Sequence, residues 1–128
     1  MTTPRLSSIV VRVADVDRSA RFYAALGLEL VPERHGAGPA HFSSKCGDVL
    51  FEIFPLPRGS ATGPAVRLSF RVDSVVETVE RLLCAGWTVR ASSVAGEHGE
   101  RAVVLDPDGH QVELFTGAGC GAARIGQT

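Results

Sequence analysis

Two glutamates in strand-like segments, Glu52 and Glu113, have the type and placement that most favour chemistry in this sequence. Each stands in an alternating run, Leu50-Phe-Glu-Ile-Phe54 and Gln111-Val-Glu-Leu-Phe115. Alternate residues share one face of a strand, so the glutamates lie opposite the apolar face. A carboxylate there can bind a divalent metal ion, pair with a cation or act as general acid or base. Glu52 and Glu113 are therefore candidate catalytic or ligand-binding residues.

A third segment, residues 66–72, alternates in the same way. Arg67 and Ser69 share a polar face, whereas Leu68, Phe70 and Val72 share an apolar face suited to packing under a helix. We hypothesise that Arg67 lies near Glu52 or Glu113 and pairs with one or both carboxylates.

His41 opens a predicted strand and follows a loop that contains two glycines, Gly36 and Gly38. It could supply a metal ligand or act as a general base near neutral pH. We favour the alternative of a half-buried strand histidine bonded to a backbone carbonyl. His98 and His110 lie in or beside predicted turns, where we expect them to be solvated.

The elements that must position these residues occur twice. Hydrophobic periodicity and turn residues predict the same order of one strand, one helix and three strands in each half of the chain. The first half has strands at 9–13, 28–33, 41–45 and 49–54 and a helix at 18–26. The second half has strands at 66–72, 87–94, 101–105 and 110–115 and a helix at 75–85. Asp15 or Asp17 and Asp73 or Ser74 are candidate helix caps, and Gly27 and Gly86 end the helices.

The repeat defines the expected organisation of a single domain, residues 1–128. It comprises a first βαβββ module at 6–55, a linker at 56–65, a second module at 66–116 and a flexible tail at 117–128. One half alone is a four-stranded sheet with one bare face. Two halves can bury or enclose that face together, which gives a physical reason for the duplication.

Composition limits the classes of function. The 128 residues are 45% hydrophobic, enough for a core, and the net charge of -1 gives no reason to expect nucleic acid or an anionic membrane. No long apolar run is present, so we expect neither a membrane-spanning segment nor a signal peptide. The three cysteines form no Cys-x-x-Cys motif, so reduced thiols in the cytoplasm are expected, with Cys46 near a turn and Cys84 in the core.

Two motifs resemble those of one known family. The stretch Val13-Ala-Asp-Val-Asp-Arg-Ser-Ala-Arg-Phe-Tyr-Ala-Ala-Leu-Gly-Leu28 resembles the opening signature of the vicinal oxygen chelate superfamily, which includes glyoxalases, bleomycin-resistance proteins and extradiol dioxygenases. The stretch Leu105-Asp-Pro-Asp-Gly-His-Gln-Val-Glu-Leu114 resembles its closing signature. The resemblance implies an α+β fold of two βαβββ modules with curved mixed sheets around a cleft, a small-molecule ligand or substrate and a homodimer.

The resemblance also implies where a divalent metal would bind. In metal-bearing relatives the ligands occupy four strand positions, which fall here on Ser8, Glu52, Arg67 and Glu113. Serine is a poor ligand for such metals, and arginine cannot ligate because it stays protonated. We therefore favour no metal cofactor and expect the Arg67 guanidinium to occupy the space of the metal. If a metal binds, we expect Glu52, Glu113 and His41 to hold it.

Three functions remain open, and catalysis is not decided. The favoured one is a small-molecule-binding protein without the usual four-ligand metal site. The alternatives are a metal-dependent lyase, isomerase or dioxygenase with an atypical ligand set, and a metal-free acid/base enzyme that uses Glu52, Glu113 or His41. The predicted ligand-binding residues are Ser8, His41, Glu52, Phe54, Arg67, Ser69, Gln111 and Glu113.

Overall fold

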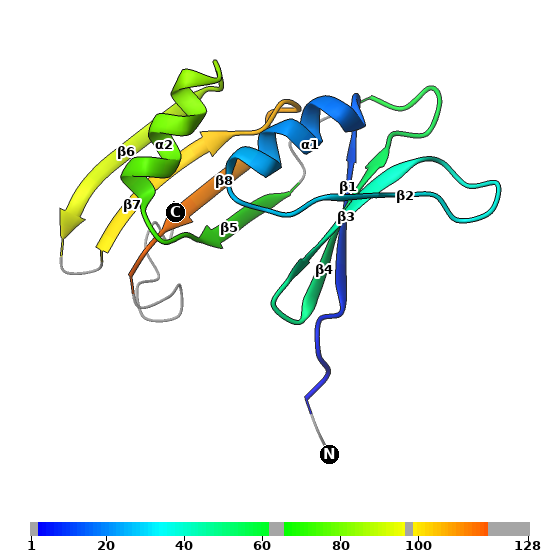
Figure 1. Ribbon diagram of the computed structural model, residues 1–128, viewed down its shortest axis with the longest axis horizontal. Helices are drawn as coiled ribbons and strands as arrows, with labels where there is room; N and C mark the ends of the chain where they lie inside the picture. Colours follow the sequence, from blue (N-terminus) through cyan, green and yellow to red (C-terminus); the bar gives the residue numbers. More distant parts are fainter. Residues whose placement is uncertain (1–2, 62–65, 97–98, 118–128) are drawn as a thin grey trace. The chain divides into compact units, whose positions relative to one another are not determined.

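The computed structural model describes residues 3–61, 66–96 and 99–117 of the chain. It divides into two compact units, Met1–Thr62 and Gly63–Thr128, and the division falls inside the predicted linker. The first unit contains one helix and four strands, drawn in blue to green in Figure 1. In chain order these are β1 (Ser8–Val13), α1 (Val16–Ala25), β2 (Val31–Glu33), β3 (His41–Cys46) and β4 (Val49–Pro55).

The strands of the first unit form a mixed sheet in the order β1-β4-β3-β2. β1 and β4 are parallel, and the other neighbouring pairs are antiparallel. Helix α1 packs against one face, where the rings of Tyr23 and Phe51 lie 5.0 Å apart. Phe51 and Ile53 are buried on this face, while Glu52 and Phe54 alternate to the opposite, helix-free face, as predicted.

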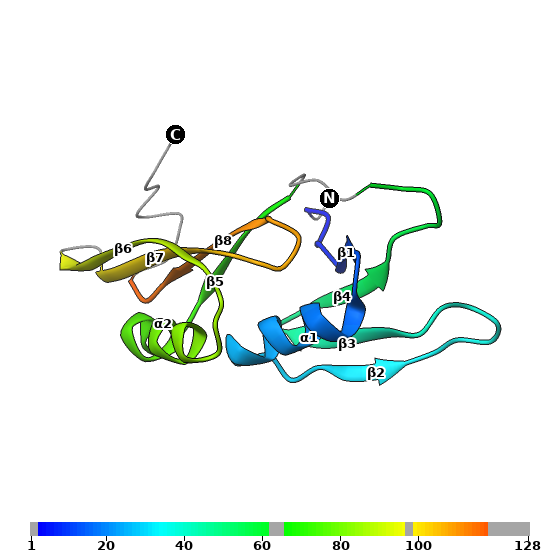
Figure 2. The ribbon, with the colours of Figure 1, turned by 90° about the horizontal axis from the view of Figure 1, so that it is seen from above.

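The second unit repeats this order of elements. It contains β5 (Arg67–Arg71), α2 (Val75–Cys84), β6 (Val89–Gly96), β7 (Gly99–Leu105) and β8 (Gln111–Phe115). Its sheet has the order β5-β8-β7-β6, with β5 and β8 parallel. Figure 2 shows α2 on one side of this sheet. Val112 and Leu114 are fully buried, and Gln111, Glu113 and Phe115 are partly exposed, which confirms the predicted alternation.

Both helices begin and end by the same local chemistry. Asp15 accepts a hydrogen bond from the backbone N–H of Arg18, and Ser74 accepts one from Glu77, so each helix has a polar N-cap. After each helix a glycine adopts positive φ, 112° at Gly27 and 88° at Gly86, as predicted for a C′ residue.

The same helix ends explain two differences from the predicted strands. The N–H of Leu28 donates to the Tyr23 carbonyl, and that of Trp87 donates to the Leu82 carbonyl. These bonds hold both residues at the end of a helix, so β2 begins at Val31 rather than 28, and β6 begins at Val89 rather than 87.

The prediction that Cys84 lies in the core was wrong. Helix α2 buries Val75, Thr78 and Leu82, and Cys84 lies on the exposed side of its last turn. Predictions on His98, Cys120 and the tail beyond Gly117 lie outside the described residues.

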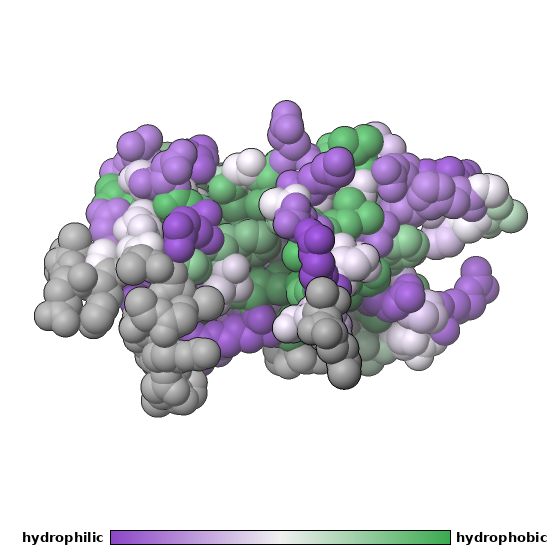
Figure 3. Space-filling view, turned by 90° about the horizontal axis from the view of Figure 1, so that it is seen from below, coloured by the Kyte–Doolittle hydropathy of each residue, from purple (hydrophilic) through white to green (hydrophobic). Residues whose placement is uncertain are grey.

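Hydrophilic side chains are interspersed with hydrophobic ones on the face shown in Figure 3. Within the described ranges, no helix combines the length and apolar character needed to cross a membrane.

The order of elements and the two strand orders define the architecture as two βαβββ modules, each with one helix and a mixed four-stranded sheet.

Candidate functional site

A row of four side chains crosses the helix-free face of the first sheet. Arg12 of β1 is paired in register with Phe54 of β4, and Glu33 of β2 is paired with His41 of β3. The Arg12 guanidinium carbon lies 5.7 Å from the centroid of the Phe54 ring. On its other side Phe54 stacks against His41, with centroids 4.0 Å apart and ring planes inclined by 11°. The row presents a cation, an aromatic ring, an imidazole and a carboxylate in that order.

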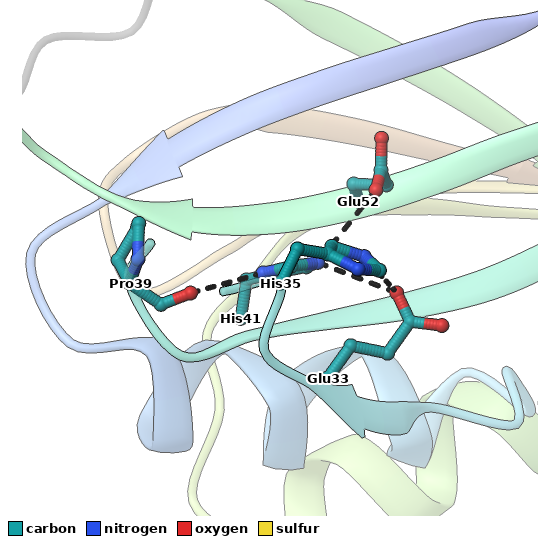
Figure 4. A network of polar contacts seen from close by, with 5 residues as sticks. All are labelled: Glu33, His35, Pro39, His41 and Glu52. Carbon is teal, nitrogen blue, oxygen red and sulfur yellow. Dashed lines mark hydrogen bonds and ion pairs between the residues drawn. The ribbon is translucent and has the colours of Figure 1, made fainter. Parts of the chain in front are cut away.

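His41 lies at the centre of the polar contacts in Figure 4. Its Nδ1 is 3.1 Å from the Pro39 carbonyl oxygen, which confirms the predicted backbone bond. The histidine is more deeply buried than predicted, with 2% exposure, because Phe54 covers one side of its ring. Its Nε2 lies 3.3 Å from Oε1 of Glu33 and 3.9 Å from Oε2 of Glu52. Among the described residues, Nε2 has no partner with hydrogen-bond geometry.

Glu33 and His35 were not among the predicted site residues. The Nε2 atom of His35 lies 3.6 Å from Oε1 of Glu33, the oxygen that also faces His41. The pKa of Glu33 is lowered, chiefly by a hydrogen bond from Ser43, although burial acts in the opposite direction. His41 and His35 lower this pKa further. Hairpin pairing of β2 with β3 is the signal that could have placed Glu33 opposite His41.

Glu113 is the centre of the polar cluster on the second sheet. The Ser69 hydroxyl donates a 2.9 Å hydrogen bond to Oε1 of Glu113. Oε2 lies 3.9 Å from Arg67 and 4.0 Å from Arg101. The predicted pairing of Arg67 with a glutamate is therefore confirmed at Glu113. Arg101 is a further cation of this cluster that the sequence did not identify.

The two sheets carry an arginine and a phenylalanine at equivalent positions. In the second unit Arg71 of β5 is paired in register with Phe115 of β8, as Arg12 is with Phe54 in the first. The guanidinium carbon again lies 5.7 Å from the ring centroid. Arg101 of β7 is in turn paired with Phe115, on the side where His41 stands in the first unit.

The predicted residues fall into two sets of four. Ser8, His41, Glu52 and Phe54 belong to the first unit, and the other four belong to the second. Ser8 is exposed and pairs with Leu50 at the start of its strand. The set of the second unit lies on β5 and β8 of one sheet and comprises Arg67, Ser69, Gln111 and Glu113.

The prediction that His110 is solvated was wrong. Its side chain is buried, and its Nδ1 lies 2.9 Å from Oδ2 of Asp106. The other oxygen of Asp106 accepts hydrogen bonds from the backbone N–H groups of Asp108 and His110. The tight turn therefore places the imidazole of His110 against the carboxylate of Asp106. This contact is structural, and His98 lies outside the described residues.

Comparison with known proteins now establishes the family. The model of the Glyoxalase/Bleomycin resistance protein/Dioxygenase superfamily matches residues 5–114, so the chain belongs to this superfamily. A search of curated proteins gives no match.

Solved structures of similar fold include proteins with different activities. The oxidase ChaP-H2 is 26% identical, with a TM-score of 0.73 over 90% of this chain and 94% of that one. TnmS3, an antibiotic binding protein from Streptomyces sp. CB03234, is 23% identical, with a TM-score of 0.71 over 92% and 99%. Lactoylglutathione lyase from Agrobacterium tumefaciens is 23% identical, with a TM-score of 0.64 over 91% and 96%. The fold alone therefore does not select an activity.

The residues at the family's four metal positions do not fit a divalent ion. Arg67 holds its guanidinium 3.9 Å from Glu113, and Arg101 and Ser69 contact the same carboxylate. These cations and the hydroxyl occupy the oxygens through which Glu113 would ligate. Ser8, at the first position, is exposed and offers a hydroxyl that binds such metals poorly.

Proposed function

We propose that this protein binds a small, flat, anionic molecule on the helix-free faces of its sheets, without the four-ligand metal site of its family. The repeated pairs Arg12–Phe54 and Arg71–Phe115 carry this proposal. A guanidinium beside an aromatic ring offers an anion a charge-assisted hydrogen bond, and the edge of the ring offers a flat molecule an apolar contact. The same pair at the same register in both sheets supports a binding role over chance packing.

The TnmS3 structure gives independent support to binding. TnmS3 is an antibiotic binding protein, and its fold resembles this chain over 92% of the sequence. Many antibiotics contain flat conjugated rings, which suit the exposed arginine and phenylalanine faces. We also propose a homodimer, the state implied by the resemblance to the family.

Isothermal titration with anilinonaphthalene sulfonate, a flat aromatic anion, tests the proposal. We expect binding of the flat anion, and Arg12→Gln and Arg71→Gln should each weaken it by about tenfold, which corresponds to ~1.4 kcal/mol. Arg21→Gln is the matched control, because Arg21 is exposed on α1 and not on a sheet. Equal binding by all three variants would exclude the arginine faces as the binding site.

A metal-dependent enzyme is the second candidate. One observation favours it, namely the group formed by Glu33, His35 and His41, whose ligand atoms all lie within 4.8 Å of one another. Assays of lyase, isomerase and dioxygenase substrates with added zinc, manganese or iron test this candidate. A metal-free acid/base role for Glu113 is disfavoured, because Arg67 and Ser69 hold its carboxylate.

A further inference from the structure

The loop between β2 and β3 brings three potential metal ligands together within the first unit. Glu33 ends β2, His41 begins β3 directly opposite, and His35 lies in the loop that connects them. Their ligand atoms all lie within 4.8 Å of one another. Figure 4 shows both imidazole rings directed towards the Glu33 carboxylate. All three residues belong to one hairpin, so the geometry of the cluster is set by β2, β3 and the loop that joins them.

The tautomer of His41 follows from its contact with Pro39. The Pro39 carbonyl can only accept a hydrogen bond, so the Nδ1 atom 3.1 Å away must carry the proton. Nε2 of the neutral ring then carries the lone pair, and it lies 3.3 Å from Glu33 and 3.9 Å from Glu52, whose carboxylates are also acceptors. A lone pair this close to two carboxylates is unfavourable unless a cation or a proton lies among them.

The burial of His41 increases this cost. The residue is 2% exposed, and its Nε2 has no hydrogen-bond partner within the described part of the chain. A buried polar atom without a hydrogen-bond partner destabilises the folded state. A second proton on the ring is one way to remove the cost, and a bound metal ion is the other.

The distances fit an ion of the zinc type. Ligand atoms 2.0–2.1 Å from a tetrahedral ion lie roughly 3.3–3.4 Å from one another. The Glu33 oxygen is 3.3 Å from Nε2 of His41 and 3.6 Å from Nε2 of His35. Two edges of the tetrahedron are therefore close to the required length. His35 is 76% exposed at its side chain, so its ring can move to complete the third edge.

We propose that Glu33, His35 and His41 form a binding site for a divalent transition-metal ion, with zinc as the best fit. Two imidazole nitrogens with one carboxylate favour zinc, cobalt or nickel over magnesium and calcium, which prefer oxygen ligands. None of these three residues occupies a metal position of the superfamily, so the ligand set differs from that of the family's metal centre even where Glu52 supplies the fourth ligand.

The fourth ligand is water or Glu52. The Glu52 carboxylate lies 3.9 Å from Nε2 of His41, just beyond the three proposed ligands. It can ligate directly or hold a metal-bound water. The contact of Nδ1 with the Pro39 carbonyl orients the His41 ring, as outer partners of metal-binding histidines do. The proposal requires no arginine, although Phe54 of the anion-binding face packs against His41.

Titration of the full chain with zinc chloride tests the proposal. The untagged protein is first dialysed against a chelator and then titrated by calorimetry, with bound metal counted by elemental analysis. We expect about one zinc ion per chain. His35→Gln and Glu33→Gln should each weaken binding by at least about tenfold, since loss of an outer partner alone can cost this much. Glu29→Gln, at an exposed glutamate outside the cluster, should bind zinc as the wild type does.

A second readout does not depend on variants. Diethylpyrocarbonate modifies exposed imidazoles, so His35 should react in the metal-free protein and be protected by zinc, as measured by peptide mass spectrometry. The absence of bound zinc would overturn the proposal and favour a protonated His41 between the carboxylates. Zinc bound equally by His35→Gln and Glu33→Gln would also overturn it, because the ion would then lie elsewhere.

Discussion

Phe54 covers the buried ring of His41 in a stacked contact, with centroids 4.0 Å apart and planes inclined by 11°. The contact joins neighbouring strands and fixes the ring plane, while Pro39 fixes its rotation. Phe54 is therefore a positioning residue for Nε2 of His41 as well as part of the aromatic face beside Arg12.

The stack should contribute measurably to stability. An aromatic pair contributes about 0.5–1.5 kcal/mol beyond the area that it buries. We expect a coupling of that size between Phe54→Leu and His41→Gln in a double-mutant cycle, measured by urea unfolding. The pair Phe54→Leu and Cys46→Ser is the control and should be additive, because Cys46 is paired in register with Val49 at the other end of β4. Strict additivity of the first pair would show that the stack contributes nothing.

Glu113 and Arg67 should differ in their effect on stability although they contact each other. The Arg67 side chain is 43% exposed, so Arg67→Leu should cost less than about 1 kcal/mol. Glu113 is 13% exposed and Arg101 14% exposed at their side chains, so Glu113→Leu removes the carboxylate from a partly buried guanidinium. We expect a loss of about 2–3 kcal/mol, within the range for breaking a desolvated pair.

Urea unfolding of both variants measures this difference. Glu113→Gln should fall between them, because the amide oxygen still accepts the bond from Ser69. Equal losses for Arg67→Leu and Glu113→Leu would mean that Arg67 carries the whole interaction of Glu113.

The buried turn of the second unit should depend on Asp106. Its carboxylate accepts two backbone hydrogen bonds and contacts the ring of His110. Since a lost bond to a charged group costs roughly 1.5–3 kcal/mol, Asp106→Ala should destabilise by at least about 2 kcal/mol.

Asp48→Ala, in the corresponding turn of the first unit, is the control. The contact of Asp48 with Arg5 is exposed, so this variant should cost less than about 1 kcal/mol. Calorimetric melting of both variants provides the comparison, and a mild effect of Asp106→Ala would contradict a structural role for the turn.

The fold could be predicted because its signals are local. Alternation placed Glu52 and Glu113 on the correct faces, and Asp15 and Gly27 marked the limits of a helix. Alternation also predicted that Arg67 pairs with a glutamate, but it left Glu52 and Glu113 as alternatives; the parallel pairing of β5 with β8 selects Glu113.

The site could be predicted only in part because burial and pairing depend on tertiary structure. His110 was misassigned because turn residues are usually exposed, whereas Asp106 folds this turn inward. Glu33 was missed because β2 has only three residues, Val31–Glu33, and gives almost no alternation. Its role depends on the register with His41, which the sequence does not state.

The two described cysteines should differ in their reaction with iodoacetamide. Burial raises the pKa of the Cys46 thiol, although a hydrogen bond from Ser44 acts in the opposite direction. Because the thiolate is the nucleophile, a raised pKa lowers the thiolate fraction at pH 8 and shifts the rise in rate to higher pH. Cys84 is exposed on α2, so it should react several times faster than Cys46.

Mass spectrometry of a Cys120→Ser variant over time measures both rates separately. Unfolding in urea should abolish the difference, because the burial of Cys46 is then lost. Faster reaction of Cys46 in the folded protein would mean that its thiol is activated rather than buried. A rate for Cys84 that falls with protein concentration would instead indicate that α2 is covered by a second copy of the chain.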